Sequence, residues 1–275
     1  MHAHGPVYPL TPASLTFGLI HLAAMAVCFV PFTPALAWMA LGLYGVRMFG
    51  VTAGYHRYFS HRAYKLGRVA QFLLAFLAQS SGQKGVLWWA ALHRDHHRHA
   101  DGPEDIHSPV QDSFWWSHVG WILADRYDHP DLTKVQDLAR FPELRWLNTY
   151  HWMPALVLGL GVAAWGRLTG VGAASALAWW ALSTVMLYHA TFCINSLAHV
   201  WGTRRFETPD RSRNNALLAL LTLGEGWHNN HHAFPGTSRQ GLRWWEVDLT
   251  QGALRALAWM RVVKDIRPHP RGARP

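Results

Sequence analysis

The segment His93-Arg94-Asp95-His96-His97-Arg98-His99 decides the fold, because it places four imidazoles within seven residues. In a helix, His93 and His97 lie one turn apart on one face, and His96 lies at the neighbouring i+3 position. Neutral imidazole is a common ligand for iron, copper, nickel and zinc. Two further histidine clusters lie at residues 56–61 and 228–232. The pattern therefore predicts a fold that brings the three clusters together.

The spacing of the first cluster recurs elsewhere in the chain. The 228–232 cluster repeats the i, i+3, i+4 pattern, and one more histidine follows Asn195 by a helical turn. The candidate metal ligands are His56, His61, His93, His96, His97, His199, His228, His231 and His232. This set exceeds what one metal ion needs and suits two metals. The alternative for any single cluster is a polar surface at the end of a helix.

The ligand types narrow the choice of metal chemistry. None of the clusters contains the His-Glu-x-x-His pattern of a zinc protease. Asp95 lies on the helix face away from His93 and His97, so we expect it to orient a neighbouring side chain, and Glu225 is another nearby carboxylate. An all-nitrogen site that holds two irons activates dioxygen for attack on an unactivated C–H bond. The sequence thus argues against a zinc protease and leaves the identity of the metals open at this point.

The composition predicts an integral membrane protein of one domain, residues 1–275. Charged residues make up 15% of the chain, against roughly 25% in soluble domains. Aromatic residues reach 13%, with 16 tryptophans, as in proteins with interfacial belts. The net charge of +9 comes from arginines scattered among apolar runs, so a membrane surface explains it better than nucleic acid. No Lys or Arg precedes the first apolar run, so we expect no cleaved signal peptide.

Four apolar runs predict an all-α fold with four transmembrane helices in two hairpins. The runs lie at about 15–32, 35–55, 152–166 and 172–194. Each has roughly the length that spans a bilayer, although the third is short. Residues 68–80 have helical spacing of apolar side chains, which predicts a helix at the membrane interface. A third spanning helix at 68–80 is the alternative, and it would separate the clusters that contain His56 and His93.

The remaining residues predict a helical cap on one side of the membrane. The cap covers about 56–150 and 195–265, followed by a basic tail at 266–275 that we expect to be disordered. Only Arg167 falls in a turn on the far side, so the positive-inside rule places the cap and both termini in the cytoplasm. Arg47 is the one charge within the first two runs, and it either snorkels or makes an interior contact.

In its histidine clusters and the segments around them, the chain resembles the membrane fatty acyl desaturases, in particular the stearoyl-CoA-type Δ9 desaturases and their bacterial relatives. The matching segments are His56-Arg57-Tyr58-Phe59-Ser60-His61, His93-Arg94-Asp95-His96-His97, Ser117-His118-Val119-Gly120-Trp121, Asn195-Ser196-Leu197-Ala198-His199 and Gly224-Glu225-Gly226-Trp227-His228-Asn229-Asn230-His231-His232. The histidine boxes alone define a wide superfamily that includes hydroxylases. The Asn-Ser-x-Ala-His and Gly-Glu-Gly-x-His-Asn segments are much more specific to acyl desaturases.

The resemblance implies a function and a set of cofactors. It implies that the nine histidines bind two irons and that Asn195 holds a metal-bound water. It also implies dioxygen as co-substrate, electrons from a cytochrome b5 or ferredoxin-type donor, and a cis double bond at carbon 9 of a fatty acyl-CoA or acyl-lipid in the bacterial inner membrane. Zinc can take the place of iron in isolated protein as an artefact, because the affinity of such ligands for zinc can exceed their affinity for ferrous iron.

The chain departs from the family pattern where the head group binds. Ala91 and Leu92 stand where animal acyl-CoA desaturases carry an Arg-Asp pair, whose arginine helps to hold coenzyme A. Acyl-CoA and acyl-lipid therefore both stay open as substrates. Arg126 is a candidate phosphate contact, as are Arg204 and Arg205; the alternative is a basic surface that faces the membrane.

The position of an acyl tunnel can be approached from helical geometry. Thr52, Met48, Tyr44 and Ala40 precede His56 at successive helical turns. We hypothesise that this face lines a tunnel with Ala40 near its floor; ordinary packing of small residues between helices is the alternative. The adjacent tryptophans Trp88 and Trp89 are candidate tunnel walls or part of an interfacial belt.

Two rival functions remain at this stage. A fatty acyl or lipid hydroxylase on the same di-iron scaffold needs the same iron, oxygen and electrons, so only its product distinguishes it. A metal-binding membrane transporter or sensor would bind metal without consuming oxygen. That second rival would place polar ligands within the spanning helices, whereas the histidines here follow the ends of apolar runs.

Overall fold

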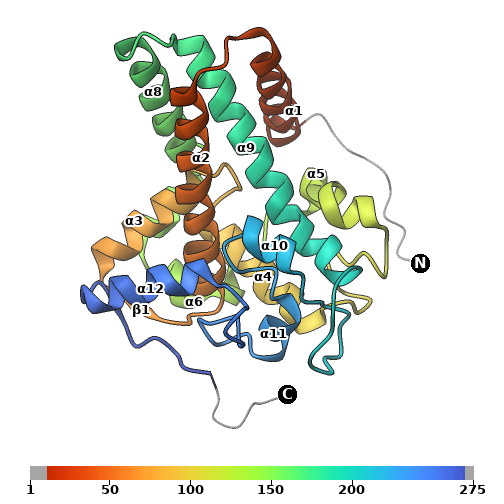
Figure 1. Ribbon diagram of the computed structural model, residues 1–275. Helices are drawn as coiled ribbons and strands as arrows, with labels where there is room; N and C mark the ends of the chain where they lie inside the picture. The colour runs from red at the N-terminus through yellow and green to blue at the C-terminus, as the bar shows by residue number, and fades with distance from the viewer. Residues whose placement is uncertain (1–10, 270–275) are drawn as a thin grey trace.

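The computed structural model describes residues 11–269, and its architecture is helical apart from one very small sheet (Figure 1). The sheet pairs β1 (Lys65–Leu66) antiparallel with β2 (Val263–Lys264). Long helices rise from one end of the molecule, and shorter ones gather at the other. The expectations about a signal peptide and about most of the basic tail concern residues 1–10 and 270–275, which lie outside the described residues.

The first hairpin begins with a capped helix. Thr11 caps α1 (Pro12–Met25) by accepting a hydrogen bond from the Ser14 backbone at 3.1 Å, and Ser14 returns the contact at 3.0 Å. The short η1 (Ala26–Phe29) extends this helix. Thr33 then caps α2 (Pro34–Phe49). Because Pro follows each cap, both helices begin with a residue whose φ is already helical.

The second helix continues without a break into η2 (Gly50–Ser60), a π-helix in which every residue is buried. A π-helix has a wider turn than an α-helix and is frequent at functional sites. Gly50 makes its packing possible, since a Cβ there would lie 3.0 Å from the backbone of Leu77 and Ala78 on α3 (Arg68–Gln79). This close contact positions the first histidine cluster beside the rest of the cap.

α3 spans 12 residues, or about 18 Å at 1.5 Å per residue. This is much shorter than the roughly 30 Å of a bilayer core, which argues against the alternative of a third spanning helix at 68–80. The next helix, α4 (Val86–His99), carries the central histidine cluster. Its first turn is capped by Asn148, whose Oδ1 accepts hydrogen bonds from Leu87 N and Trp88 N, both at 3.1 Å.

The second hairpin pairs α8 (Met153–Leu168) with α9 (Ala173–Asn195). A Cβ on Gly166 would lie 2.6 Å from Gly172 O, so glycine there allows the tight turn between them. Arg47 is buried between α2 and α9, where it donates to Thr184 Oγ1 at 2.6 Å and Ser183 Oγ at 2.7 Å. The interior contact, rather than snorkelling, is therefore correct for this arginine.

Within residues 11–269, three helical stretches are long and apolar enough to cross a membrane, namely Pro12–Phe29, Pro34–Ser60 and Ala173–His199. Met153–Leu168 is a shorter apolar helix of 16 residues. Large apolar side chains on these stretches point outward, among them Leu19, Leu22, Trp38 and Leu160. Such a surface is typical of contact with lipid rather than water.

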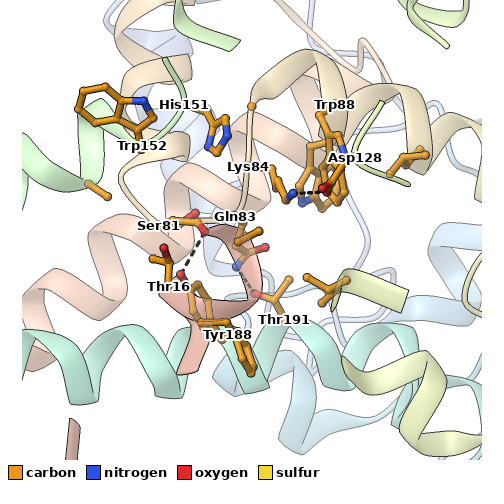
Figure 2. A pocket seen from close by; sticks show the side chains of 18 of the residues that line it. Thr16, Ser81, Gln83, Lys84, Trp88, Asp128, His151, Trp152, Tyr188 and Thr191 are labelled. Atoms are coloured by element: carbon orange, nitrogen blue, oxygen red, sulfur yellow. Dashed lines mark hydrogen bonds and ion pairs between the residues drawn. The ribbon is translucent and has the colours of Figure 1, made fainter. Parts of the chain in front are cut away.

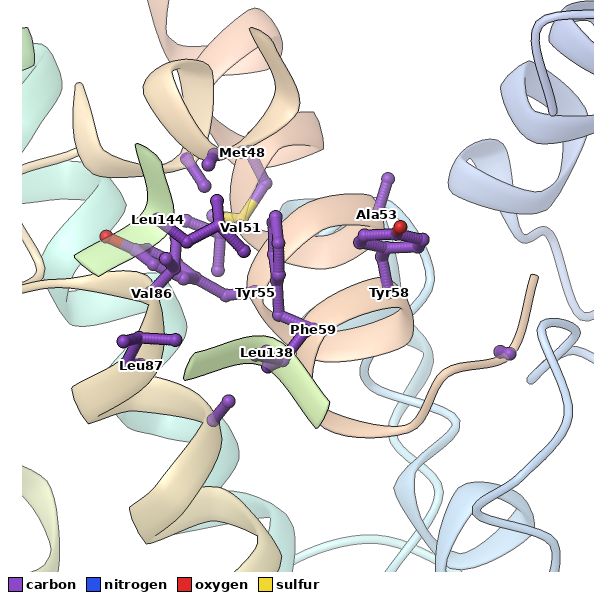
Figure 3. Packing of buried hydrophobic residues seen from close by; sticks show 14 of the residues in the cluster. Met48, Val51, Ala53, Tyr55, Tyr58, Phe59, Val86, Leu87, Leu138 and Leu144 are labelled. Atoms are coloured by element: carbon purple, nitrogen blue, oxygen red, sulfur yellow. The ribbon is translucent and has the colours of Figure 1, made fainter. Parts of the chain in front are cut away.

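The remaining helices form the histidine-bearing end of the molecule. They are η3 (Trp116–Gly120), α5 (Trp121–Leu123), η4 (Asp125–Tyr127), η5 (Leu132–Val135), α6 (Gln136–Ala139), α7 (Pro142–Thr149), η6 (Leu197–His199), α10 (Ala216–Leu221), α11 (His228–Ala233) and α12 (Leu249–Trp259). Their apolar core packs Tyr55 and Phe59 of η2 against Val86 and Leu87 of α4 and Leu138 of α6 (Figure 3). Each such buried side chain contributes about 1.5–3 kcal/mol, which holds η2 against α4.

Candidate metal centre

One group of imidazoles converges on a single point. It comprises His56, His61, His93, His97 and His231, whose ligand atoms lie within 4.8 Å of one another. Nε2 of His231 lies 3.0 Å from Nε2 of His56 and 3.0 Å from Nε2 of His97. Ligands at about 2.1 Å from one metal and at right angles to each other lie about 3 Å apart. The donor set therefore fits one metal ion.

A second group lies beside the first and comprises His96, His199, His228 and His232. Nε2 of His199 and Nε2 of His228 lie 3.1 Å apart. His232 Nε2 is buried and has no hydrogen-bond partner among residues 11–269. A buried nitrogen lone pair without a partner is costly, and a bound metal would satisfy it. This second set also fits a metal ion.

The repeated i, i+3, i+4 spacing explains how two helices serve two sites. Successive residues of a helix point about 100° apart. On α4, His97 belongs to the first group and its neighbour His96 to the second. On α11, His231 belongs to the first group, whereas its neighbour His232 belongs to the second. The rings of His97 and His232 lie with centroids 4.5 Å apart, so the two groups share a boundary.

Buried carboxylates orient several of these rings. The contacts are His96 Nδ1 to Asp105 at 2.9 Å, His199 Nδ1 to Asp101 at 2.8 Å, His232 Nδ1 to Asp210 at 3.0 Å, and an ion pair of His56 Nδ1 with Glu225. A carboxylate that accepts the Nδ1 proton fixes the tautomer and leaves Nε2 free to bind metal. Burial alone would raise the pKa of Asp101, but the hydrogen bond from His199 holds that pKa at about 2.

Several imidazoles of the two groups are kept neutral, whereas Asp105 outweighs burial and raises the pKa of His96. Burial, followed by repulsion from neighbouring histidines, lowers the pKa of His61, His93 and His97 well below its usual value. The same causes lower the pKa of His228 and His231. Neutral imidazole is the form that binds metal, so the site is set up for metal at physiological pH.

Asp95 does not have the expected orienting role. Its carboxylate accepts from Lys134 Nζ at 2.7 Å and contacts His99, which is part-exposed and also pairs with Glu104 at 3.0 Å. The orienting carboxylates other than Glu225 were not found from the sequence. Asp101 contacts a histidine 98 positions away, so no local spacing could have marked it.

Three histidines outside the nine candidate ligands, His107, His118 and His129, differ from one another in burial and in their contacts. His107 is buried beside His96, with ring centroids 4.3 Å apart, and lies close to Asp105. His118 is also buried, and its Nε2 lies 2.9 Å from Nδ1 of His189 on α9. His129 is exposed. His118 therefore makes a structural contact with α9, whereas His107 lines the main cavity and forms a further group of possible metal ligands with His96 and Asp105.

Asn195 lies where two hollows meet. One is a small cleft lined by Met48, Thr52, His56, His93, His96, His228 and other residues. The other, the main cavity, has a volume of about 920 Å³ and also reaches Asn195 and His93. The Ser117 hydroxyl fixes this end of α9 by donating to the Asn195 carbonyl at 2.9 Å. The side chain expected to hold a metal-bound water is thus next to the histidines.

The main cavity runs along α9 (Figure 2). Trp88 and Trp89 line it, as proposed from the sequence. Figure 2 shows the ion pair between Lys84 and Asp128 next to Trp88, with Tyr188 elsewhere on the wall. A cavity of this volume lies within the range that holds an extended small-molecule ligand.

The structure corrects the expected course of the tunnel along α2. Ala40 and Tyr44 line neither the main cavity nor the small cleft. The Ala40 carbonyl accepts from Ser183 at 2.8 Å, and the Tyr44 hydroxyl donates to Leu221 O at 2.6 Å. These residues make contacts between elements, whereas Met48 and Thr52 of the same face reach the small cleft. Ala40 is buried where α2 packs on α9, and Tyr44 instead contacts α10.

The candidate phosphate contacts do not line the main cavity either. Arg126 is exposed and stacks over the rings of Trp116 and Tyr127, at 4.8 Å from each centroid. Arg205 pairs with Glu246, and Arg204 donates to carbonyls of its own loop. Internal contacts therefore account for Arg204 and Arg205.

Comparison with known proteins agrees with this geometry. The family model described as "Fatty acid desaturase" matches residues 16–263. The chain is 33% identical over 263 residues to an acyl-CoA 5-desaturase of Anemone leveillei, covering 91% of this chain and 77% of that protein. It is 34% identical over 259 residues to an sn-1 stearoyl-lipid 9-desaturase of Anabaena variabilis, covering 92% of each. It is 32% identical over 268 residues to an sn-2 palmitoyl-lipid 9-desaturase of Nostoc sp. (strain 36), covering 92% and 89%. The chain therefore belongs to the fatty acid desaturase family and is an oxidoreductase.

Proposed function

We propose that this enzyme uses dioxygen at a di-iron centre to insert a cis double bond between carbons 9 and 10 of a saturated fatty acyl chain. The observation that carries the proposal is the pair of imidazole groups beside a long cavity. In the overall reaction a CH2–CH2 unit, dioxygen, two electrons and two protons give CH=CH and two waters. We assign the electrons to a cytochrome b5 or ferredoxin-type donor.

In this proposal each imidazole group holds one iron through Nε2. The first iron takes His56, His61, His93, His97 and His231, and the second takes His96, His199, His228 and His232. When bound, the irons supply the oxygen chemistry that removes hydrogen from an unactivated C–H bond. Such nitrogen ligands bind zinc more tightly than ferrous iron, so zinc in purified protein would not contradict the assignment.

The chain itself contributes orientation and the exclusion of water. Asp101, Asp105 and Asp210 hold the Nδ1 protons, so the rings keep one tautomer. Trp89 stacks on His93 with ring centroids 4.8 Å apart and also lines the main cavity. An acyl chain in the cavity would pass this tryptophan, and the depth of the cavity would select which carbons lie next to the metals. Asn195 is placed to hold a water at the same point.

We also propose the membrane arrangement that follows from the helices. The stretch Met153–Leu168 joins the three longer apolar stretches as a fourth spanning helix, so that two hairpins stand under one cap in a single domain. Arg167 is the only charge in the two far turns, which supports a cytoplasmic cap with both termini inside. In a bacterium this membrane is the inner membrane.

The test is to express the chain in a host with little desaturase activity, beside a His96→Ala/His97→Ala double variant. Fatty acids are then profiled by mass spectrometry with localisation of double bonds. We expect a new cis monoene at carbon 9 that the double variant does not make. A hydroxylated product would favour the hydroxylase on the same scaffold. Bound metal without any oxygen-dependent product would favour the transporter or sensor.

A further inference from the structure

The main cavity follows α9 through most of the depth of a membrane. Its lining on that helix comprises Trp180, Thr184, Tyr188, Thr191, Phe192 and Asn195. From Asn195 to Trp180 the helix rises about 22 Å at 1.5 Å per residue. Because Ala173–His199 is one of the stretches able to cross a membrane, this part of the cavity lies at the level of lipid tails, while lining residues such as Trp89, Leu123 and Asn148 belong to the histidine-bearing end.

The cavity is open on the side formed by α1 and α8. Thr16 of α1 lines the cavity and is exposed. Trp152 and Leu156, at the start of α8, also line it and are 55% and 50% exposed. Figure 1 shows α1 and α8 on either side of α9. A cavity whose lining is partly exposed opens at that surface, and this surface consists of apolar helices. The opening between α1 and α8 therefore faces the bilayer, whereas the exposed lining residues His129 and Leu132 mark another opening at the histidine-bearing end.

The cavity presents no net charge to a ligand. Lys84 and Asp128 are the only Lys, Arg, Asp or Glu among the described residues that line it, and they pair with each other (Figure 2). Coenzyme A carries several phosphate groups, which proteins bind with arginine and lysine. Arg126 lies near Asp128 in sequence, but it is stacked on Trp116 and Tyr127 outside the lining. The lining is therefore poorly suited to a coenzyme A head group.

We propose that the substrate is an acyl chain that is still esterified in a membrane glycerolipid and that enters the cavity sideways, between α1 and α8. The inference rests on the desaturase function proposed above and specifies its substrate class. Uncharged side chains at the opening, such as His151 and Trp152, offer neutral hydrogen-bonding groups and an aromatic face to the glycerol ester. From there the chain reaches Trp89 and His93, and its tail extends toward Trp180.

The test compares two labelled pools in membranes that contain the full chain and a working electron donor. In one, the glycerolipids are prelabelled with deuterated stearate, washed free of acyl-CoA and supplied with reductant. In the other, unlabelled membranes receive deuterated stearoyl-CoA for a short time. We expect at least tenfold faster initial formation of monoene in the glycerolipid pool. Monoene that appears first in acyl-CoA would overturn the inference while leaving desaturation intact. Monoene in neither pool would overturn the desaturase function and this inference together.

A matched pair of variants tests the route. Ala155→Trp places an indole in the opening, because Ala155 lines the cavity on α8. Ala164→Trp places the same group on the exposed face of α8, away from the lining. We expect Ala155→Trp to slow glycerolipid desaturation at least tenfold and Ala164→Trp to leave it unchanged, with equal metal content in both. Ala13→Trp closes the opening from α1 and serves if Ala155→Trp fails to accumulate. Unchanged rates for both lining variants would overturn sideways access.

Discussion

Asp105 Oδ1 lies 2.9 Å from His96 Nδ1, and this contact decides which nitrogen of His96 faces its histidine neighbours. The carboxylate accepts the Nδ1 proton, so the Nε2 lone pair is left for a metal. Asp105 also accepts from the Asp101 backbone at 2.8 Å, which fixes the carboxylate in turn. A carboxylate that lines neither the main cavity nor the small cleft thus orients one ligand of the second imidazole group.

An Asp105→Asn variant tests this control. We expect about 10–100-fold weaker metal binding at the second group, because the neutral amide holds the ring less firmly. The measurement is metal content and affinity by titration of metal-depleted protein. Asp95→Asn is the matched control, since Asp95 pairs with Lys134 and contacts none of the grouped histidines. An equal loss of metal affinity in both variants would contradict an orienting role for Asp105.

Removal of metal is expected to destabilise the cap. Without a metal, no cation separates Nε2 of His231 from Nε2 of His56 and Nε2 of His97, each 3.0 Å away. A metal at a hundredfold excess over its Kd adds about 2.7 kcal/mol to the free energy of unfolding. Thermal unfolding in detergent, with and without a chelator, measures this difference. An identical Tm in both samples would argue against a metal site.

Replacing Gly42 of α2 or Gly50 of η2 by alanine is expected to change the stability of the protein in different ways. Gly50→Ala brings a Cβ to 3.0 Å from the backbone of Leu77 and Ala78, which cannot shift easily. We expect a loss of about 1–3 kcal/mol in the free energy of unfolding. Gly42→Ala meets no atom within 4 Å and is expected to be neutral or stabilising by up to about 1 kcal/mol. Urea unfolding of the two variants distinguishes close packing from a general effect of helical glycine.

The inner part of the cavity is expected to set chain length. Ile20 of α1 lines the cavity, one turn beyond Phe17, whose ring stacks on Tyr188 at 5.9 Å. Ile20→Trp should shorten the preferred acyl chain by filling this part of the cavity. Leu19→Trp is the matched control, because Leu19 is 64% exposed and lies outside the lining. Product profiles that shift equally for both, or for neither, would contradict this position for the acyl tail.

One pH effect follows from the contact between Asp137 and Arg94. The guanidinium donates to both carboxylate oxygens, at 2.7 and 3.1 Å. Burial alone would raise the pKa of Asp137, but the hydrogen bonds from Arg94 lower it below its ordinary value of 3.8. The contact therefore stabilises the fold fully above about pH 5 and loses its contribution as pH falls through the lowered pKa. Asp137→Asn should be less stable than the unmodified chain at pH 7, with the difference shrinking below pH 4 in urea unfolding. A constant difference across this range would contradict the assignment.

Much of the site could be predicted because its chemistry lies in local sequence spacing. The i, i+3, i+4 patterns mark histidines on α4 and α11 as candidate ligands, so the nine histidines and a two-metal site could be proposed before any contact was known, whereas their division into two groups comes from the structure. The apolar runs likewise indicated the long helices, since length and hydropathy are local properties.

Other features depend on contacts between distant segments. Asp101 and Asp210 are ordinary loop carboxylates until the fold brings them to His199 and His232. The course of the cavity was missed for a similar reason. A helical face such as Ala40 to Thr52 can be recognised from sequence, but which of its residues line a cavity depends on neighbouring segments: Met48 and Thr52 reach the small cleft, whereas Ala40 contacts Ser183 of α9.

The most direct test of the central claim follows the hydrogens themselves. Cells that express the chain receive stearate deuterated throughout its chain, and the product is analysed by mass spectrometry with double-bond localisation. The account predicts a cis monoene at carbon 9 that has lost two deuterons and gained no oxygen, only with dioxygen present and with His96 and His97 intact. A product that has lost one deuteron and gained one oxygen atom would contradict desaturation and identify the enzyme as a hydroxylase.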